Sequence, residues 1–169
     1  MSQYRPPEGG VSNNLVVLFS ASSEKTYNKL FLAALEWGTA RYRRTHYVRR
    51  QRFARIPTVP PQCLSDPSRL KTIRFYYADD RPLEKASSLS VDYRVRHNES
   101  LIIVETDEES SMERHALANT LALLASFATQ KRRSLVSLPQ DDDLMTLASL
   151  FTRHLYNLDD EGRLLKVTR

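Results

Sequence analysis

The residues best able to do chemistry in this chain are arginines gathered in one segment. Between positions 41 and 55 the sequence holds seven arginines and no acidic residue: Arg41, Arg43, Arg44, Arg49, Arg50, Arg52 and Arg55. Aromatic and histidine side chains lie between them, namely Tyr42, His46, Tyr47 and Phe53. A guanidinium group binds phosphate or carboxylate through paired hydrogen bonds, and an aromatic ring beside it can stack on a base. We therefore take Tyr47 and the seven arginines as a candidate binding site.

Three interpretations of this arginine-rich segment stay open. The partner could be RNA or DNA, whose phosphates would be contacted by Arg43, Arg44, Arg49, Arg50 and Arg52. An acidic protein surface is an equally good partner in physical terms. The segment also fits a solvated basic face without a dedicated role, anchored to the domain by its tyrosines and Phe53.

Patterns that indicate catalysis are missing from the sequence. The four histidines, His46, His97, His115 and His154, lack the spacing of metal ligands. The carboxylates at 141–143 could bind a cation, but a helix N-terminus favours such residues through its dipole alone. No phosphate-binding glycine loop and no Gly-x-Ser-x-Gly turn occurs. We expect a protein that is not an enzyme and that uses no metal, cofactor or small-molecule substrate.

Composition indicates a globular protein. The chain has 169 residues, of which 41% are hydrophobic and 27% charged, and its net charge is +5. Its one cysteine, Cys63, excludes an internal disulfide and is expected to be an inert thiol. No apolar run reaches the length of a membrane span, and no signal-peptide pattern opens the chain. We expect an intracellular protein. The cytoplasm is the favoured location, and the nucleus and the organelles are alternatives.

The first half of the sequence predicts a leader, a strand and a helix. Residues 1–14 have the composition of a flexible leader, and residues 15–19 form a short β-branched apolar run typical of a buried strand. The serines at 20–23 can cap a helix that ends at Gly38, which is expected in a left-handed conformation. Its apolar face consists of Tyr27, Leu30, Phe31, Ala34 and Trp37. The prolines of residues 56–67 predict an irregular linker after the arginine-rich segment.

The last third of the sequence, residues 107–169, predicts a helical hairpin. Ser110 and Glu113 are spaced as a capping box before a first helix. Its apolar stripe comprises Leu117, Leu121, Leu123, Leu124, Phe127 and Ala128, and Lys131, Arg132 and Arg133 follow at its C-terminus. Residues 134–140 are expected to link it to a second helix that begins at Asp141. The face of that second helix comprises Leu144, Leu147, Phe151, Leu155 and Leu158.

Residues 72–104 resemble the second half of ubiquitin-like, or β-grasp, domains. The resemblance rests on Ala78, Leu83, Glu84, Leu89, Asp92, Tyr93, Val95, Glu99, Ser100, Leu101 and Val104. In that family a strand and turn lead to a short Leu-Glu segment, a loop carrying Asp-Tyr, and a last hydrophobic strand. This sequence departs from the pattern by an extra residue at about Arg81 or Pro82 and another at about Val91.

The resemblance implies a β-grasp unit over residues 15–106, with the arginine-rich segment 41–55 as an insertion. Such a unit begins with two strands, whereas one clear strand precedes the helix here. The other would come from the leader, from residues 42–48, or from residues 163–169. The Gly-Gly ending of conjugated modifiers is absent, which favours a built-in interaction module.

Together these patterns predict an α+β protein: a β-grasp unit with a C-terminal two-helix extension. The expected function is a non-catalytic binding or scaffold subunit of a larger macromolecular assembly. It would dock on protein partners through the arginine-rich segment and an apolar helical face. The alternative is an RNA-binding protein, such as a ribonucleoprotein component, that contacts phosphates through residues 41–55.

Overall fold

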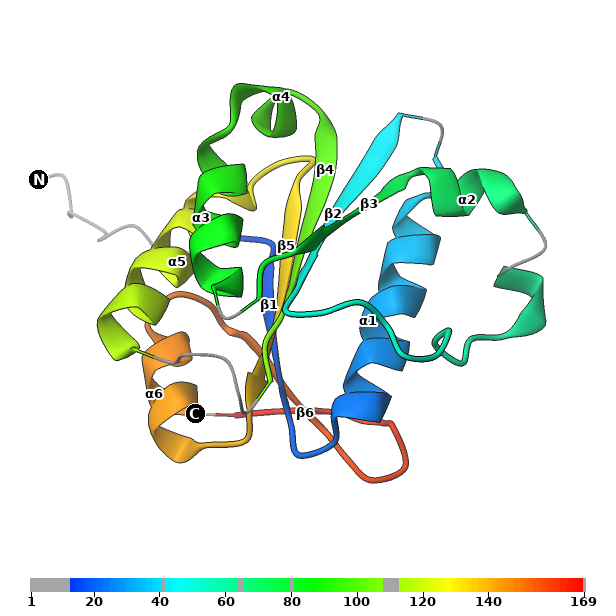
Figure 1. The fold of residues 1–169 in the computed structure, drawn as a ribbon. Helices are drawn as coiled ribbons and strands as arrows, with labels where there is room; N and C mark the ends of the chain where they lie inside the picture. The colour runs from blue at the N-terminus through cyan, green and yellow to red at the C-terminus, as the bar shows by residue number, and fades with distance from the viewer. Residues whose placement is uncertain (1–12, 41, 64–65, 80, 108–112, 169) are drawn as a thin grey trace, which may run out of the picture.

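The protein is built on a seven-stranded, mostly parallel sheet with strand order β3-β2-β4-β5-β1-β6-β7 (Figure 1). The computed structural model describes residues 13–40, 42–63, 66–79, 81–107 and 113–168. The strands are β1 Leu15–Ser20, β2 Arg43–Arg49, β3 Ile73–Tyr77, β4 Glu99–Glu105, β5 Arg133–Pro139, β6 His154–Leu158 and β7 Leu164–Lys166. Every neighbouring pair is parallel except β6 and β7, which are antiparallel. The first six strands therefore all begin at one edge of the sheet and end at the other.

Helices cover both faces of the sheet (Figure 1). On one face lie α1, Ser23–Trp37, and α2, Pro67–Lys71. On the other lie α3, Pro82–Val91, α5, Arg114–Phe127, and α6, Asp142–Ser149. The short elements are a 3-10 turn, Pro61–Cys63, and α4, Tyr93–Arg96.

Two apolar cores result, one on each side of the sheet. The alternation of β4 shows the division: Leu101 and Ile103 belong to the core under α1, whereas Ile102 and Val104 belong to the core under α3 and α5. A strand buried on both faces has no polar alternation, which is why residues 101–104 are continuously apolar.

The β-grasp fold predicted from residues 72–104 is wrong. A β-grasp unit packs a helix on one face of a sheet that contains hairpins. Here β3 and β4 are both parallel to β2, flank it on either side, and are joined by helices on the far face from α1. The fold is an α/β sandwich of alternating strands and helices, and neither the ubiquitin-like resemblance nor the α+β class holds.

The error arose in residues 82–91, which form α3 rather than a Leu-Glu segment and a polar loop. Pro82 lies in the first turn, where proline is well tolerated, and Leu83, Ala86 and Leu89 are buried at helical spacing. Three serines interrupt the apolar spacing of this helix, and serine is a weak helix former, so the sequence pattern indicates the helix only weakly.

The C-terminal two-helix extension is also wrong. Residues 133–139, predicted as the last residue of a helix end and most of the linker 134–140, form β5 between β4 and β1, and residues 154–158 form β6 rather than the end of a helix. Both are short strands in the middle of a parallel sheet, where apolar residues on either face imitate a helical stripe. The sheet thus draws strands from both sides of the boundary expected near residue 107.

Several local predictions are confirmed. The strand at 15–19 is β1, and α1 has Ser22 as its N-cap, with the Ser22 side chain accepting a hydrogen bond from the Lys25 amide. Gly38 does follow this helix, but its φ of −72° is not left-handed. A Cβ at Gly38 would collide with the Thr72 side chain, so close approach accounts for the glycine.

Some expectations lie outside the described residues, namely the leader as far as residue 12 and the cap at Ser110. In the described part of α5, Glu113 itself is the N-cap, accepting hydrogen bonds from the amides of His115 and Ala116. None of the helices in the described part of the chain combines the length and the apolar character that a membrane span needs.

Candidate functional site

The fold divides the arginine-rich segment between two opposite edges of the sheet. Strand β2 is seven residues long, which separates its ends by roughly 20 Å. Arg43 and Arg44 lie at the edge where the parallel strands begin, and Arg49 lies where they end. Arg50, Arg52 and Arg55 follow in the loop, and Arg41 lies outside the described residues. The segment is therefore not one continuous docking surface.

At the carboxyl-terminal edge, Arg49 and Tyr47 are bound to a carboxylate that the sequence places far away. Arg49 Nε donates to Glu105 Oε2 at 2.8 Å and Nη2 donates to Oε1 at 3.0 Å. The Tyr47 hydroxyl donates to the same Oε2 at 2.7 Å. The guanidinium of Arg49 also lies over the Phe53 ring, 3.4 Å from its centroid. With side-chain exposures of 12% for Arg49 and 10% for Glu105, this cluster is nearly dry.

The protonation state of the Tyr47 hydroxyl agrees with its place in this buried cluster. Its burial, reinforced by the neighbouring Glu105 carboxylate, raises the pKa of the Tyr47 hydroxyl well above its usual value of 10.0. The hydroxyl stays protonated and donates to the carboxylate. Arg50 is likewise bound, because its Nε donates to Asp107 Oδ2 at 2.8 Å. These three predicted site residues contribute to holding β2, β4 and their loops together.

A crevice of about 390 Å³ opens at this edge between the ends of β1, β4 and β5. In doubly wound sheets the crevice beside a reversal of winding is the usual ligand site, and here β1 continues into α1 on one face while β5 continues into α6 on the other (Figure 1). Its polar side chains bond to neighbouring protein groups: the hydroxyls of Thr106 and Thr26 donate to the carbonyls of Ser137 and Ser22. Glu105 is bound by Arg49 and Tyr47. The polar side chains of the crevice therefore stabilise the surrounding protein structure.

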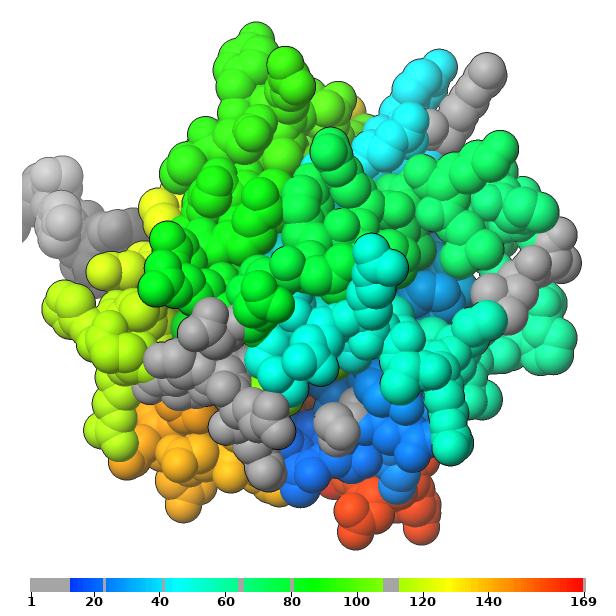
Figure 2. Space-filling view, viewed as in Figure 1, coloured from blue at the N-terminus to red at the C-terminus, as the bar shows by residue number. Residues whose placement is uncertain are grey.

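A second depression of about 460 Å³ adjoins that crevice and holds Arg52 and Arg55. Figure 2 shows the segment after β2, in cyan, on the surface beside α1, in blue. Arg52 lies over the Tyr77 ring, 5.6 Å from its centroid, and both arginines are exposed. Glu24, Glu105 and Asp107 line the same depression, so its positive charge is largely offset.

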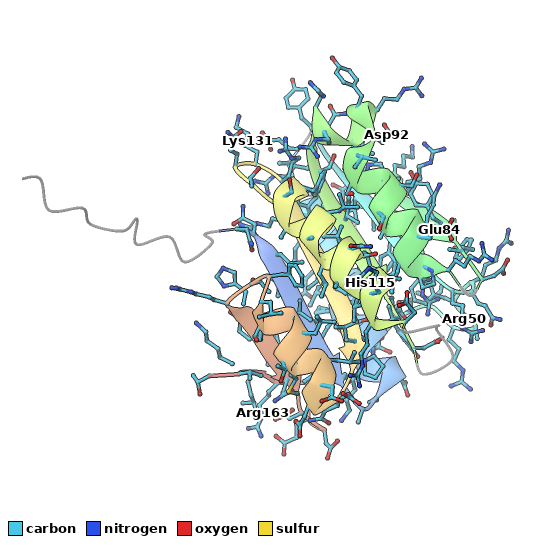
Figure 3. All side chains as sticks on the ribbon, turned by 90° about the vertical axis from the view of Figure 1, so that its left-hand side faces the viewer. Arg50, Glu84, Asp92, His115, Lys131 and Arg163 are labelled. Atoms are coloured by element: carbon cyan, nitrogen blue, oxygen red, sulfur yellow. The ribbon has the colours of Figure 1, made fainter. Side chains whose placement is uncertain are left out.

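The opposite, amino-terminal edge of the sheet is basic in a way that the sequence did not reveal. Loops before β2, β4 and β5 meet around a depression of about 650 Å³. It is lined by Tyr42, Arg96, His97, Asn98, Glu99, Gln130, Lys131 and Arg132. Figure 3 shows Lys131 and Asp92 toward one end of the molecule and Arg163 at the other.

This depression continues along the edge. A smaller one of about 250 Å³ shares Glu99, Gln130 and Lys131 with it and adds Arg43 and Arg133. A third, of about 310 Å³, shares Arg43, Arg133 and Trp37 with the second and reaches Ala33 and Glu36 of α1. We call the three together the amino-edge groove.

Positive charge dominates the amino-edge groove. Its basic lining residues are Arg43, Arg96, Lys131, Arg132 and Arg133, and its acidic ones are Glu36 and Glu99. Glu99 is shared, because its carboxylate lies 3.3 Å from Arg43 Nε and 3.6 Å from Lys131 Nζ. Five cations therefore face two carboxylates among the described residues of the lining, which gives the groove a positive field.

Two side chains give this groove a fixed shape. Arg132 donates to the carbonyls of Phe127 at 2.8 Å and Arg96 at 2.7 Å, which joins two of the loops. Trp37 forms the floor farther along: the guanidinium groups of Arg43 and Arg133 lie 4.3 and 5.4 Å from its ring centroid. Cations stacked on an aromatic ring are attracted to it and keep their N–H donors directed outward.

His46 and Cys63 both contact other side chains of the protein. His46 Nδ1 lies 2.9 Å from the Tyr76 hydroxyl, and burial, with a smaller effect of the Arg74 charge, lowers the pKa of His46 to about 4. Cys63 is half-buried and packs against the core under α1. The described residues contain no group of three or more side chains arranged to hold a metal ion.

Comparison of the chain with protein-family models, with curated proteins and with solved structures finds no match. The two edges of the sheet, where the parallel strands begin and end, therefore hold the candidate sites from which a function can be inferred.

Proposed function

We propose that the protein is a non-catalytic nucleic-acid-binding subunit that holds a sugar-phosphate backbone in the amino-edge groove. One observation supports this most strongly: the starts of β2 and β5 and the loops before β4 and β5, far apart in the sequence, bring five basic side chains to three adjoining depressions. Guanidinium and ammonium groups in a groove are the usual means of following a phosphate backbone.

The basic residues proposed to bind the phosphates differ from those expected from the sequence. Arg43 remains from the arginine-rich segment, and Arg96, Lys131 and Arg133 join it. Arg49 is omitted because the Glu105 carboxylate already takes its paired donors. Arg52 and Arg55 lie at the other edge, where carboxylates offset them.

The apolar helical face is also omitted as a docking surface. The stripe of α5 faces the core, with Leu117, Leu121, Leu124 and Phe127 fully buried. An acidic protein partner in the groove is the competing possibility. The succession of three adjoining depressions and the aromatic residues beside the cations favour a nucleic-acid strand.

The test compares two charge-matched double variants in binding a fluorescent RNA strand. Lys131→Gln with Arg133→Gln removes two positive charges from the groove, and Arg52→Gln with Arg55→Gln removes two from the other edge. Anisotropy titrations between about 50 and 200 mM salt should show steep salt dependence for the wild type. The groove variant should lose about 1.4 units of log-log slope, at about 0.7 per charge on a single strand, whereas the other variant should keep the wild-type slope.

Equal losses in the two variants would mean unspecific attraction by net charge and would contradict the proposal. So would the absence of RNA binding at the lower salt concentration. An oligoglutamate peptide of the same charge provides the remaining arm: tighter binding of this peptide than of RNA would assign the groove to an acidic protein partner.

A further inference from the structure

We infer that the strand in the amino-edge groove is single, and that the widest part of the groove takes an unpaired base beside Tyr42 and His97. This inference rests on the proposed function and adds the class of ligand. Its basis is aromatic side chains and cavity size, which are independent of the charges.

The widest part of the groove has the size and lining of a base site. Its volume of about 650 Å³ lies within the range of small-molecule pockets. Tyr42 and His97 both line it, and Tyr42 is 77% exposed. The exposed tyrosine ring, beside a hollow and next to cations, is suited to stack on a base.

The His97 ring is held in place by the protein. It packs on the Tyr93 ring, with the centroids 3.7 Å apart and the planes tilted by 31°, and its Nδ1 lies 2.9 Å from the Tyr93 carbonyl oxygen. Tyr93 is itself 72% exposed, so this aromatic pair stands at the surface rather than in the core. A fixed ring loses little conformational freedom when a base packs on it.

These features suit a single strand better than a duplex. In a duplex the bases are paired and stacked inside the helix, so their faces cannot reach a side chain in a depression. An unpaired base can turn outward while its phosphates continue along the groove. The cations follow in order: Lys131 joins the first depression to the second, and Arg43 and Arg133 join the second to the third over Trp37.

The test uses a pair of variants at Tyr42 that leave all charges unchanged. Tyr42→Leu removes the ring, and Tyr42→Phe keeps it. With single-stranded RNA at fixed salt, Tyr42→Leu should weaken binding by about 5- to 150-fold, the range for losing one stacked base. Tyr42→Phe should stay within about twofold of the wild type, and the salt slope of both variants should equal that of the wild type.

Four ligands complete the measurement: single-stranded RNA, single-stranded DNA of the same sequence, an abasic strand of the same length, and the duplex. The abasic strand should bind the wild type and Tyr42→Leu equally, and the duplex should bind more weakly than either intact strand. Preference for RNA over DNA supports the inference and indicates contacts to the 2′-hydroxyl, and equal affinity supports it through the shared phosphates and bases.

Duplex binding as tight as that of the single strands would overturn the inference, and so would wild-type affinity in Tyr42→Leu. Either result leaves the proposed function standing if the Lys131 and Arg133 double variant still loses salt slope. Loss of the proposed function would show instead as an unchanged slope in that double variant.

Discussion

Arg132 donates a hydrogen bond of 2.7 Å from Nη1 to the backbone carbonyl oxygen of Arg96, which lies 36 residues earlier in the chain. The same side chain donates from Nε to the Phe127 carbonyl at 2.8 Å and from Nη2 to the Thr129 hydroxyl at 3.1 Å. Each of its three guanidinium nitrogens thus donates to a protein group. Arg132 therefore positions the loops before β4 and β5 relative to each other, and the phosphate contacts are left to its neighbours.

Replacing Arg132 should consequently affect stability as well as binding. We expect Arg132→Gln to lower the free energy of unfolding by about 1 to 3 kcal/mol, because charged donors to buried or half-buried carbonyls are lost. Urea denaturation measures this change. The neighbouring Lys131→Gln, whose side chain is 80% exposed, should change stability by less than about 0.5 kcal/mol while weakening RNA binding. Equal stability of the two variants would contradict the positioning role.

Glu105 should be essential for stability and irrelevant to the groove. Its carboxylate binds Arg49 and Tyr47 at the opposite edge of the sheet, where both members of the ion pair are almost buried. Removing one partner of such a pair leaves the other charge uncompensated, so Glu105→Gln should cost about 3 kcal/mol in unfolding free energy. The RNA affinity of the remaining folded protein, measured well below its melting temperature, should match the wild type. A large loss of affinity would mean that the carboxyl-terminal edge takes part in binding.

Glu99 provides a variant that should improve binding. Its carboxylate lies within 4 Å of two groove cations, Arg43 and Lys131, and repels a phosphate at the same place. Glu99→Gln should raise RNA affinity roughly three- to tenfold at about 100 mM salt, because one opposing charge is removed. Because both ion pairs of Glu99 are partly exposed, this substitution should change the free energy of unfolding by no more than about 1 kcal/mol. Anisotropy and thermal melting measure the two effects. A loss of affinity would show that Glu99 serves the ligand instead of restraining the cations.

Stability should fall in mildly acidic solution because of His46. Burial lowers the pKa of His46 to about 4 in the folded protein, from 6.5 in the unfolded chain, so the unfolded state binds a proton first as pH falls. The stabilisation is fully present above pH 6.5 and is lost as pH falls toward 4. For this partly exposed ring we expect roughly 1 to 2 kcal/mol. His46→Gln should show a correspondingly smaller loss between pH 7 and 4.5 in urea denaturation. Identical pH profiles for the two proteins would contradict this assignment.

Local signals in the sequence predicted local structure well. The serines before α1, its apolar period and the carboxylates at 141–143 all lie where expected, with Asp141 accepting hydrogen bonds from the amides of Asp143 and Leu144 as the N-cap of α6. Of the three segments considered for a missing β-grasp strand, 42–48 overlaps β2 and 163–169 contains β7, but both strands belong to the α/β sheet. Such features depend on neighbours within a few residues.

The strand order could not be predicted in the same way. Strand β5 reads as a linker because Ser134 and Ser137 interrupt its apolar residues, yet both serines are buried, and the Ser134 hydroxyl donates to the Leu124 carbonyl. Without β5, the sequence does not indicate that β1 lies between β5 and β6. The β-grasp resemblance was misleading because that fold has the same order of strand, loop and strand in residues 72–104.

The surroundings of the candidate site residues also depend on the strand order. The concentration of arginines in residues 41–55 was plain, but its neutralisation by Glu105 and Asp107 depends on β4 lying beside β2. Lys131 and Arg133 had an adequate explanation as charges at a helix C-terminus. Only the parallel arrangement brings the starts of β2, β4 and β5 to one edge, where those residues meet Arg43 and Arg96.

The most direct test of the account is to map where a nucleic-acid strand touches the protein. Amide chemical shifts can be followed by NMR while a single RNA strand of about ten nucleotides is added, a length that covers a typical single-strand site. The account predicts that shifts change at residues 42–44, 96–99 and 130–133, at the amino-terminal edge of the sheet. Shift changes confined to residues 49–55 and 105–107, at the carboxyl-terminal edge, with none at the amino-terminal edge, would contradict the account.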